Sequence, residues 1–118
     1  MSRDWRLYLN DILLCCGKVR RYASGMDQSR FLADDKTYDA VVRNLELIGE
    51  AAKHIPEDVR LQMPAIEWRK VAGMRDWLAH GYFGIDPDIL WDVVQRKVVE
   101  LEQAVQAFLA RPEGQTDV

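Results

Sequence analysis

The chain has 118 residues, of which 48% are hydrophobic and 30% are charged, with 16 Lys and Arg against 19 Asp and Glu. These values predict one soluble domain with its own hydrophobic core, and they exclude a disordered chain. The longest uninterrupted apolar run, 12–16, is far shorter than the ~20 residues of a membrane span. The first residues show no secretory signal pattern. A net charge of −3 gives no global sign of nucleic-acid binding, so that function would need a local patch.

The first predicted helix extends from Trp5 to Ala23, because apolar residues recur there every three or four positions. We expect Ser2 to cap it, with Asp4 in its first turn. The adjacent Cys15 and Cys16 lie within this helix. We interpret them as small buried residues in a reducing cytoplasm rather than as a redox or metal site.

Residues 24–35 are predicted to form a connection with one short helical turn. A second long helix begins near Asp34 or Asp35 and ends before Pro56, which opens a short helix. A third long helix ends at His80, followed by Gly81. A fourth covers residues 87–108, after the cap residue at 86. No segment alternates like a strand, so the sequence predicts an all-α bundle of four long helices plus one short helix. Residues 1–110 are expected to form this single domain, and 111–118 a flexible tail.

Charged residues on the second helix lie three or four positions apart, which predicts ion pairs along that helix between Arg43, Glu46, Glu50 and Lys53.

Gly49, inside the same helix, costs ~1 kcal/mol relative to Ala, which indicates a close approach by another helix. Gly73 permits the same interpretation. If the two helices touch at these glycines, Asn44, Glu46 or Glu50 would lie near Arg75.

The two histidines differ in context. His54 is interpreted as a surface residue at a helix end. His80 follows Arg75 by five positions, which is ~140° around a regular helix, so the two side chains do not share one stripe. They could meet at one ligand only if the helix end bends at Gly81 or if a second subunit completes the site.

Residues 60–75 form a basic segment of net charge +3, with one acid, Glu67, and four basic residues: Arg60, Arg69, Lys70 and Arg75. The segment is either a phosphate-facing surface or a solvated helix face. Trp68 and Trp77 could stack on bases, although aromatic residues at helical spacing are more often core anchors.

Three blocks in this order resemble the HepT family of toxins, within the HEPN superfamily of small helical ribonucleases. They are the run RNLELIGEAAK at 43–53, Trp68-Arg69, and Arg75-x4-His80-x-Tyr82. The likeness covers roughly residues 34 to 108. It implies a HEPN-like fold and a metal-independent, cytoplasmic endoribonuclease without a cofactor.

The resemblance also implies a homodimer in which Arg-x4-His segments of both subunits line one cleft. Arg75 and His80 are then expected to be catalytic, with Asp76 as a weaker candidate and Asn44 and Glu46 as possible supporting residues. The partner would be an MntA-like nucleotidyltransferase antitoxin, which transfers AMP to Tyr82.

The residue types suit RNA cleavage by the 2′-hydroxyl. Histidine, with an ordinary pKa of ~6.5, can act as base or acid, and arginine can neutralise a phosphate oxygen. No carboxylate, cysteine and histidine cluster suggests a metal site. Two other functions stay open: a non-catalytic HEPN module that binds a nucleotide or a protein partner, and a purely structural dimerisation bundle.

Overall fold

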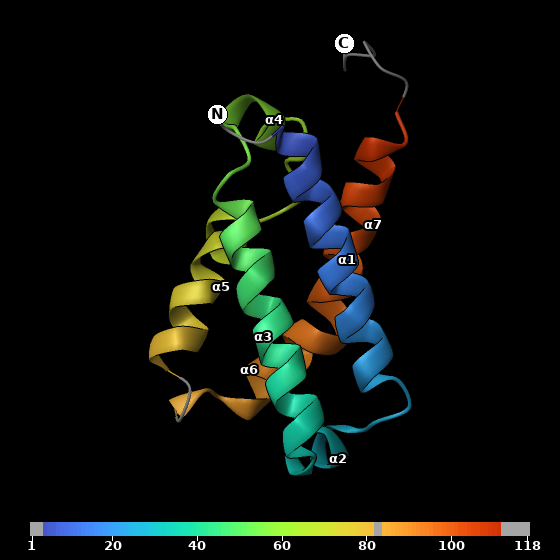
Figure 1. The fold of residues 1–118 in the computed structure, drawn as a ribbon, viewed down its shortest axis with the longest axis vertical. Coiled ribbons are helices and arrows are strands. Elements are labelled where there is room, and N and C mark those ends of the chain that lie inside the picture. The colour runs from blue at the N-terminus through green and yellow to red at the C-terminus, as the bar shows by residue number, and fades with distance from the viewer. Residues whose placement is uncertain (1–3, 82–83, 112–118) are drawn as a thin grey trace.

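The computed structural model describes residues 4–81 and 84–111, and this part of the chain contains helices and no strand. The prediction of an all-α fold is therefore confirmed. Three of the long helices are α1 (Trp5–Ala23), α3 (Asp35–Ala52) and α5 (Trp68–His80). The shorter α2 (Gln28–Ala33) and α4 (Glu57–Arg60) lie at opposite ends of the molecule (Figure 1). The last long helical segment consists of α6 (Pro87–Asp92), the π-helical η2 (Val93–Lys97) and α7 (Val98–Leu109).

Polar caps mark most helix starts, but the first cap is not the expected one. Asp4 is the N-cap of α1 and accepts a hydrogen bond from the backbone amide of Arg6 at 2.9 Å. The predicted cap, Ser2, lies outside the described residues. Asp34 caps α3 and Asp86 caps α6 in the same way. Each cap satisfies a backbone amide that has no partner inside its helix.

The predicted last long helix forms, but its backbone is π-helical between Val93 and Lys97. Leu90, Val94 and Val98 are buried and lie four residues apart. On a regular α-helix, this spacing rotates each side chain by ~40° relative to the previous one. The wider π turn reduces that drift and keeps these residues directed at the core.

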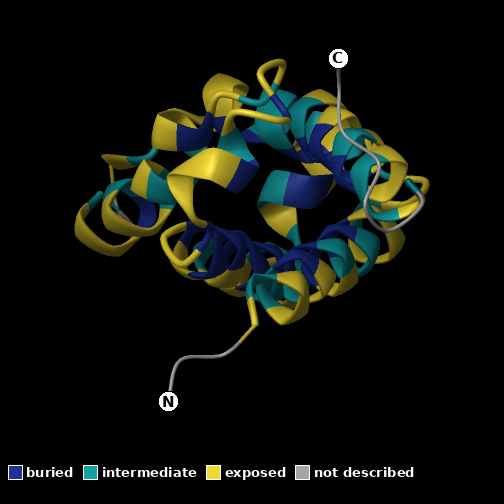
Figure 2. Ribbon diagram, turned by 90° about the horizontal axis from the view of Figure 1, so that it is seen from above, coloured by how far each residue is buried: buried dark blue, intermediate teal, exposed yellow. Residues whose placement is uncertain are grey.

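The core lies between α1, α3 and the final segment. α1 packs against both α3 and α7, whereas α5 packs mainly against α3. Buried residues face inward on all these helices (Figure 2). α5 therefore lies at the side of the bundle (Figure 1), and only Trp68 and Leu78 of its thirteen residues are buried. Most of its surface is accessible to a partner or ligand.

Both cysteines are free thiols and are buried, as predicted. Burial raises the pKa of Cys16 to about 12, with a further contribution from the nearby Glu102 carboxylate. Among the described helices, none is long and apolar enough to cross a membrane. Apart from Arg111, the expected tail lies outside the described residues, so its boundary stays a prediction.

Candidate active site

The surface of α5 carries the candidate residues Arg75, Asp76 and His80, all of them exposed. Arg75 and Asp76 lie beside α3, from which Glu50 and Lys53 reach across. Arg75 Nε is 3.1 Å from Glu50 Oε2, and Arg75 Nη1 is 3.7 Å from Asp76 Oδ1. Lys53 Nζ is 3.8 Å from Asp76 Oδ1. Two cations and two carboxylates thus alternate across the contact between α3 and α5.

Gly49 explains why the two helices lie this close. A Cβ atom there would lie 2.8 Å from the backbone nitrogen of Arg75 and 3.1 Å from the carbonyl oxygen of Val71. Only a residue without a side chain permits this approach. The prediction of a close approach at Gly49 is confirmed, and so is the proximity of Glu50 to Arg75.

The matching prediction for Gly73 is wrong, because a Cβ atom at Gly73 would have no neighbour within 4 Å. On a regular helix, Gly73 is ~200° away from Arg75, so it faces away from α3 when the backbone of Arg75 contacts α3.

Pairing along α3 is confirmed in part. Of the predicted pairs, Arg43 with Glu46 forms at 3.7 Å. Glu50 Oε1 lies 3.7 Å from the ring of His54, which follows the helix, and Glu50 and Lys53 reach residues of α5. The sequence pattern of one helix contains no information about such contacts with another.

His80 ends α5 with its ring held against the preceding turn. Its Nδ1 lies 3.0 Å from the carbonyl oxygen of Asp76. Because a carbonyl oxygen can only accept, a hydrogen bond here requires the proton on Nδ1. The lone pair of the neutral ring then lies on Nε2, directed away from that carbonyl. This arrangement suits a group that removes a proton from a ligand.

The helix is regular through His80 and does not bring that ring to Arg75. No hydrogen bond or ion pair joins these two side chains, both of which the structure describes. The helix ends as predicted, but Gly81 does not adopt the left-handed conformation. A Cβ atom at Gly81 would instead lie 2.8 Å from the carbonyl oxygen of Trp77, so glycine is needed for the close approach. Tyr82 lies outside the described residues.

Comparison with known proteins identifies the family. Residues 12–108 match the family described as Ribonuclease HepT-like. The chain belongs to the HepT-like ribonuclease family. Since the matched range includes all of α3 and α5, the contact between Arg75 and Glu50 lies inside the family's domain.

Relatives of this HepT-like protein match it along nearly their whole length. One from Methanocaldococcus jannaschii, proposed by its name to be an RNase, is 38% identical over 98% of this chain and 96% of its own. A Thermococcus cleftensis protein, named as a probable ribonuclease HepT, is 41% identical over 86% of this chain and 93% of its own. A Caldanaerobacter subterraneus protein, also proposed to be an RNase, is 37% identical over 90% and 95%. No solved structure matches.

The two possible supporting residues have partners other than Arg75. Asn44 is buried and donates a hydrogen bond to the carbonyl of Ala40, one turn earlier in α3. Glu46 pairs with Arg43. Glu50 is the residue that reaches Arg75, and the signal that could have singled it out is its position directly after Gly49, the glycine of the close approach.

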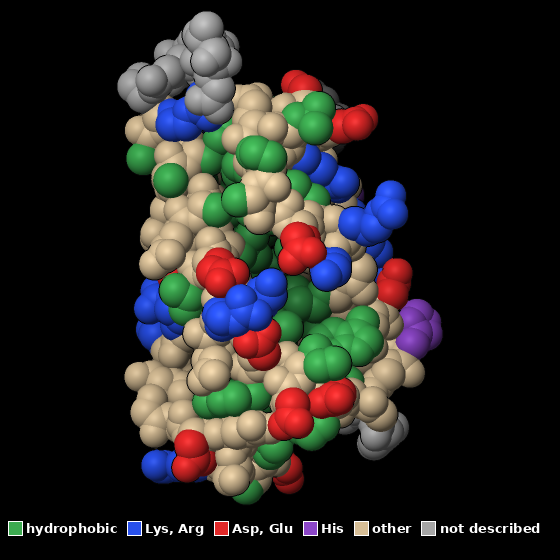
Figure 3. All heavy atoms as spheres, turned by 180° about the vertical axis from the view of Figure 1, so that it is seen from behind, with side chains coloured by type: hydrophobic (Ala, Val, Ile, Leu, Met, Phe, Trp, Pro, Cys, Tyr) green, Lys and Arg blue, Asp and Glu red, His purple; other side chains and the backbone are tan. Residues whose placement is uncertain are grey.

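The basic segment does not form a continuous cationic surface. Arg60 donates to the carbonyl of Ala52 at the end of α3, and Lys70 pairs with Glu67 at 3.0 Å. Hydrogen bonds from Lys70 and Lys97 lower the pKa of Glu67. Figure 3 shows acidic and basic groups intermixed around a central hydrophobic area on the face opposite that of Figure 1.

The two tryptophans considered for base stacking, Trp68 and Trp77, differ in exposure. Trp68 is buried in the core, which confirms a core role for it, and Trp77 is partly buried against the same core.

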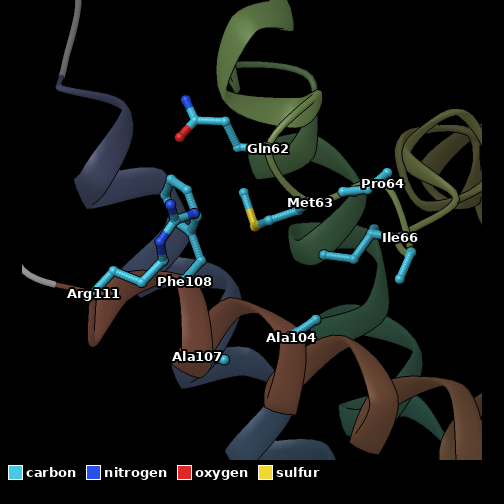
Figure 4. A pocket seen from close by; sticks show the side chains of 9 residues that line it. Gln62, Met63, Pro64, Ile66, Ala104, Ala107, Phe108 and Arg111 are labelled. Atoms are coloured by element: carbon cyan, nitrogen blue, oxygen red, sulfur yellow. The ribbon is translucent and has the colours of Figure 1, made fainter. Parts of the chain in front are cut away.

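An apolar groove of about 280 Å³ lies between the connection from α4 to α5 and helix α7. Figure 4 shows Met63 and Phe108 lining it, with Arg111 at its side. The groove lies near the start of α5, ~18 Å along that helix from His80, so it is separate from the candidate site. Within residues 4–81 and 84–111, no cluster of His, Cys, Asp and Glu is placed to hold a metal ion.

Proposed function

We propose that this protein is a metal-independent endoribonuclease toxin of a HepT/MntA toxin–antitoxin module. The observation that carries the proposal is the exposure of Arg75 and His80 on α5, the least covered long helix, in a chain of the HepT-like ribonuclease family. The names of the three relatives described above support the ribonuclease part of this proposal.

In the proposed reaction, the neutral His80 ring takes the proton of a ribose 2′-hydroxyl at Nε2. The resulting alkoxide attacks the adjacent phosphorus, and the bond to the 5′-oxygen breaks to leave a cyclic phosphate. The proton on the leaving 5′-oxygen comes from a protonated imidazole. Arg75 neutralises the non-bridging oxygens as negative charge develops on them. Asp76 acts through its carbonyl, which orients the His80 ring, and through its carboxylate beside Arg75.

The proposed active form is a homodimer. Because Arg75 and His80 are separated by ~140° around α5, one protomer does not direct both at the same phosphate. A second copy would add another Arg75 and His80 across a shared cleft. This arrangement also supplies two imidazoles, one as base and one as acid.

The proposed control of activity is transfer of AMP to Tyr82 by an MntA-like nucleotidyltransferase. An adenylate two residues after His80 would add bulk and negative charge beside the site and compete with RNA for Arg75. Intact mass of protein co-expressed with such an enzyme tests this step: wild type should gain 1 or more AMP groups, and Y82F should gain none. AMP on Y82F would reject Tyr82 as the sole target.

The central experiment incubates purified protein with single-stranded RNA in EDTA, with DNA of the same sequence as control. We expect cleavage of RNA alone, because DNA lacks the 2′-hydroxyl. R75A and H80A should each lose cleavage while keeping the wild-type melting temperature. Full activity of both variants would refute the site. RNA retained without products would favour the non-catalytic binding module instead.

A further inference from the structure

Glu50 is the closest charged neighbour of Arg75 and belongs to a different helix. Its Oε2 lies 3.1 Å from Arg75 Nε, and about half of each side chain is exposed. The adjacent Gly49 contacts the backbone of Arg75. The same backbone contact that sets the distance between α3 and α5 therefore also places this ion pair.

An ion pair at Nε leaves the terminal nitrogens of a guanidinium available. Arginine has five N–H donors, of which one lies on Nε and four on the two terminal nitrogens. With the Glu50 carboxylate beside Nε, the terminal nitrogens still carry donors for a phosphate oxygen. Asp76 makes only a longer contact of 3.7 Å with Nη1, and the same carboxylate oxygen lies 3.8 Å from Lys53 Nζ.

We propose that Glu50 is a positioning residue that fixes the plane of the Arg75 guanidinium, so that its terminal nitrogens face the scissile phosphate. This inference rests on the proposed ribonuclease function and assigns it a further residue. Without Glu50, the side chain of Arg75 would rotate among several conformers, and few of them would place its donors at the phosphate in the transition state.

If Glu50 only stabilised the fold, E50A would change the melting temperature rather than kcat. Ion pairs between half-exposed side chains contribute little to folding stability. E50A should therefore melt close to the wild-type temperature. Its effect should appear in kcat, because the geometry of Arg75 matters most when charge develops on the phosphate.

The test measures kcat and KM for cleavage of a mixed-sequence single-stranded RNA by wild type, E50A, E50Q and E50D. We expect E50A to lose about 10–100-fold in kcat, with KM changed by less than about threefold. E50Q should retain most of the activity, since a glutamine of the same length still places its amide oxygen beside Nε. E50D keeps the charge but withdraws it from Nε, so it should lose more activity than E50Q.

E100Q is the matched control, because it also removes one exposed carboxylate. Glu100 pairs with Arg96 on the final helical segment. The activity of E100Q should equal that of wild type.

Several outcomes would overturn the inference. They are wild-type or increased kcat in E50A, an effect on KM alone, or E50Q falling as far as E50D. If E50A does not fold, the order of E50Q and E50D decides. The R75A variant separates the two proposals: if it cleaves like wild type, both fail, whereas an inactive R75A beside a fully active E50A overturns only the role of Glu50.

Discussion

Replacing Gly49 with alanine should destabilise the protein, although alanine is the better helix former. The new Cβ would lie 2.8 Å from the backbone nitrogen of Arg75, about 0.6 Å short of the 3.4 Å at which ordinary contact begins. The opposing atoms belong to backbone and cannot rotate away, so α5 must shift. Overpacking of this kind lowers the free energy of unfolding by about 1–3 kcal/mol, and the higher helix propensity of alanine offsets up to ~1 kcal/mol of that loss. We expect a net loss of about 1–2 kcal/mol.

Gly73 offers a matched control in the neighbouring helix. A Cβ atom there meets nothing within 4 Å, so G73A should gain about 0.5–1 kcal/mol from helix preference alone. The two Gly→Ala variants thus change stability in opposite directions and should differ by ~1.5–3 kcal/mol.

Urea unfolding followed by circular dichroism measures both variants. The midpoint should fall for G49A and rise for G73A, with unchanged slopes. A G49A protein as stable as wild type would refute the close contact between α3 and α5. A destabilised G73A would mean that another surface covers this residue in the assembled protein.

Three further predictions concern the N-cap of α3, the ion pair between α1 and α7, and the pH dependence of stability. D34A removes the side chain that accepts from the third amide of α3, and should cost about 0.5–2 kcal/mol in urea unfolding; no change would contradict the cap. R20A leaves the buried Glu102 without its two hydrogen bonds of 2.7 and 3.0 Å. It should lower the midpoint of urea unfolding, whereas the neighbouring R21A should leave that midpoint close to the wild-type value. Because the pKa of Cys16 is raised to about 12 from 9.0, the unfolded chain loses this proton first. Stability should therefore fall as pH rises above 9 towards 12, more steeply in wild type than in C16A, and equal slopes would refute the shift.

The helices and their ends could be predicted from the sequence because their causes are local. Apolar residues every three or four positions predict an amphipathic helix, and an aspartate before a proline predicts the start of α6. The signal for a close approach at Gly49 is also local, since glycine is unfavourable inside a helix unless something requires it. The same reasoning failed at Gly73, because the cost of a glycine does not say which side of the helix another element occupies.

The charged contacts of the candidate site were decided by tertiary structure. The run from Arg43 to Lys53 permits several ion pairs, and only the packing of α5 selects Glu50 for Arg75 and Lys53 for Asp76. Charged side chains are long and flexible, so their partners depend on the distance and register of neighbouring helices. The π turn of η2 also depends on tertiary packing, because it keeps buried side chains directed at the core. Local sequence was sufficient to specify which segments are helical and which faces are apolar, whereas the contact between α3 and α5 specifies what surrounds Arg75.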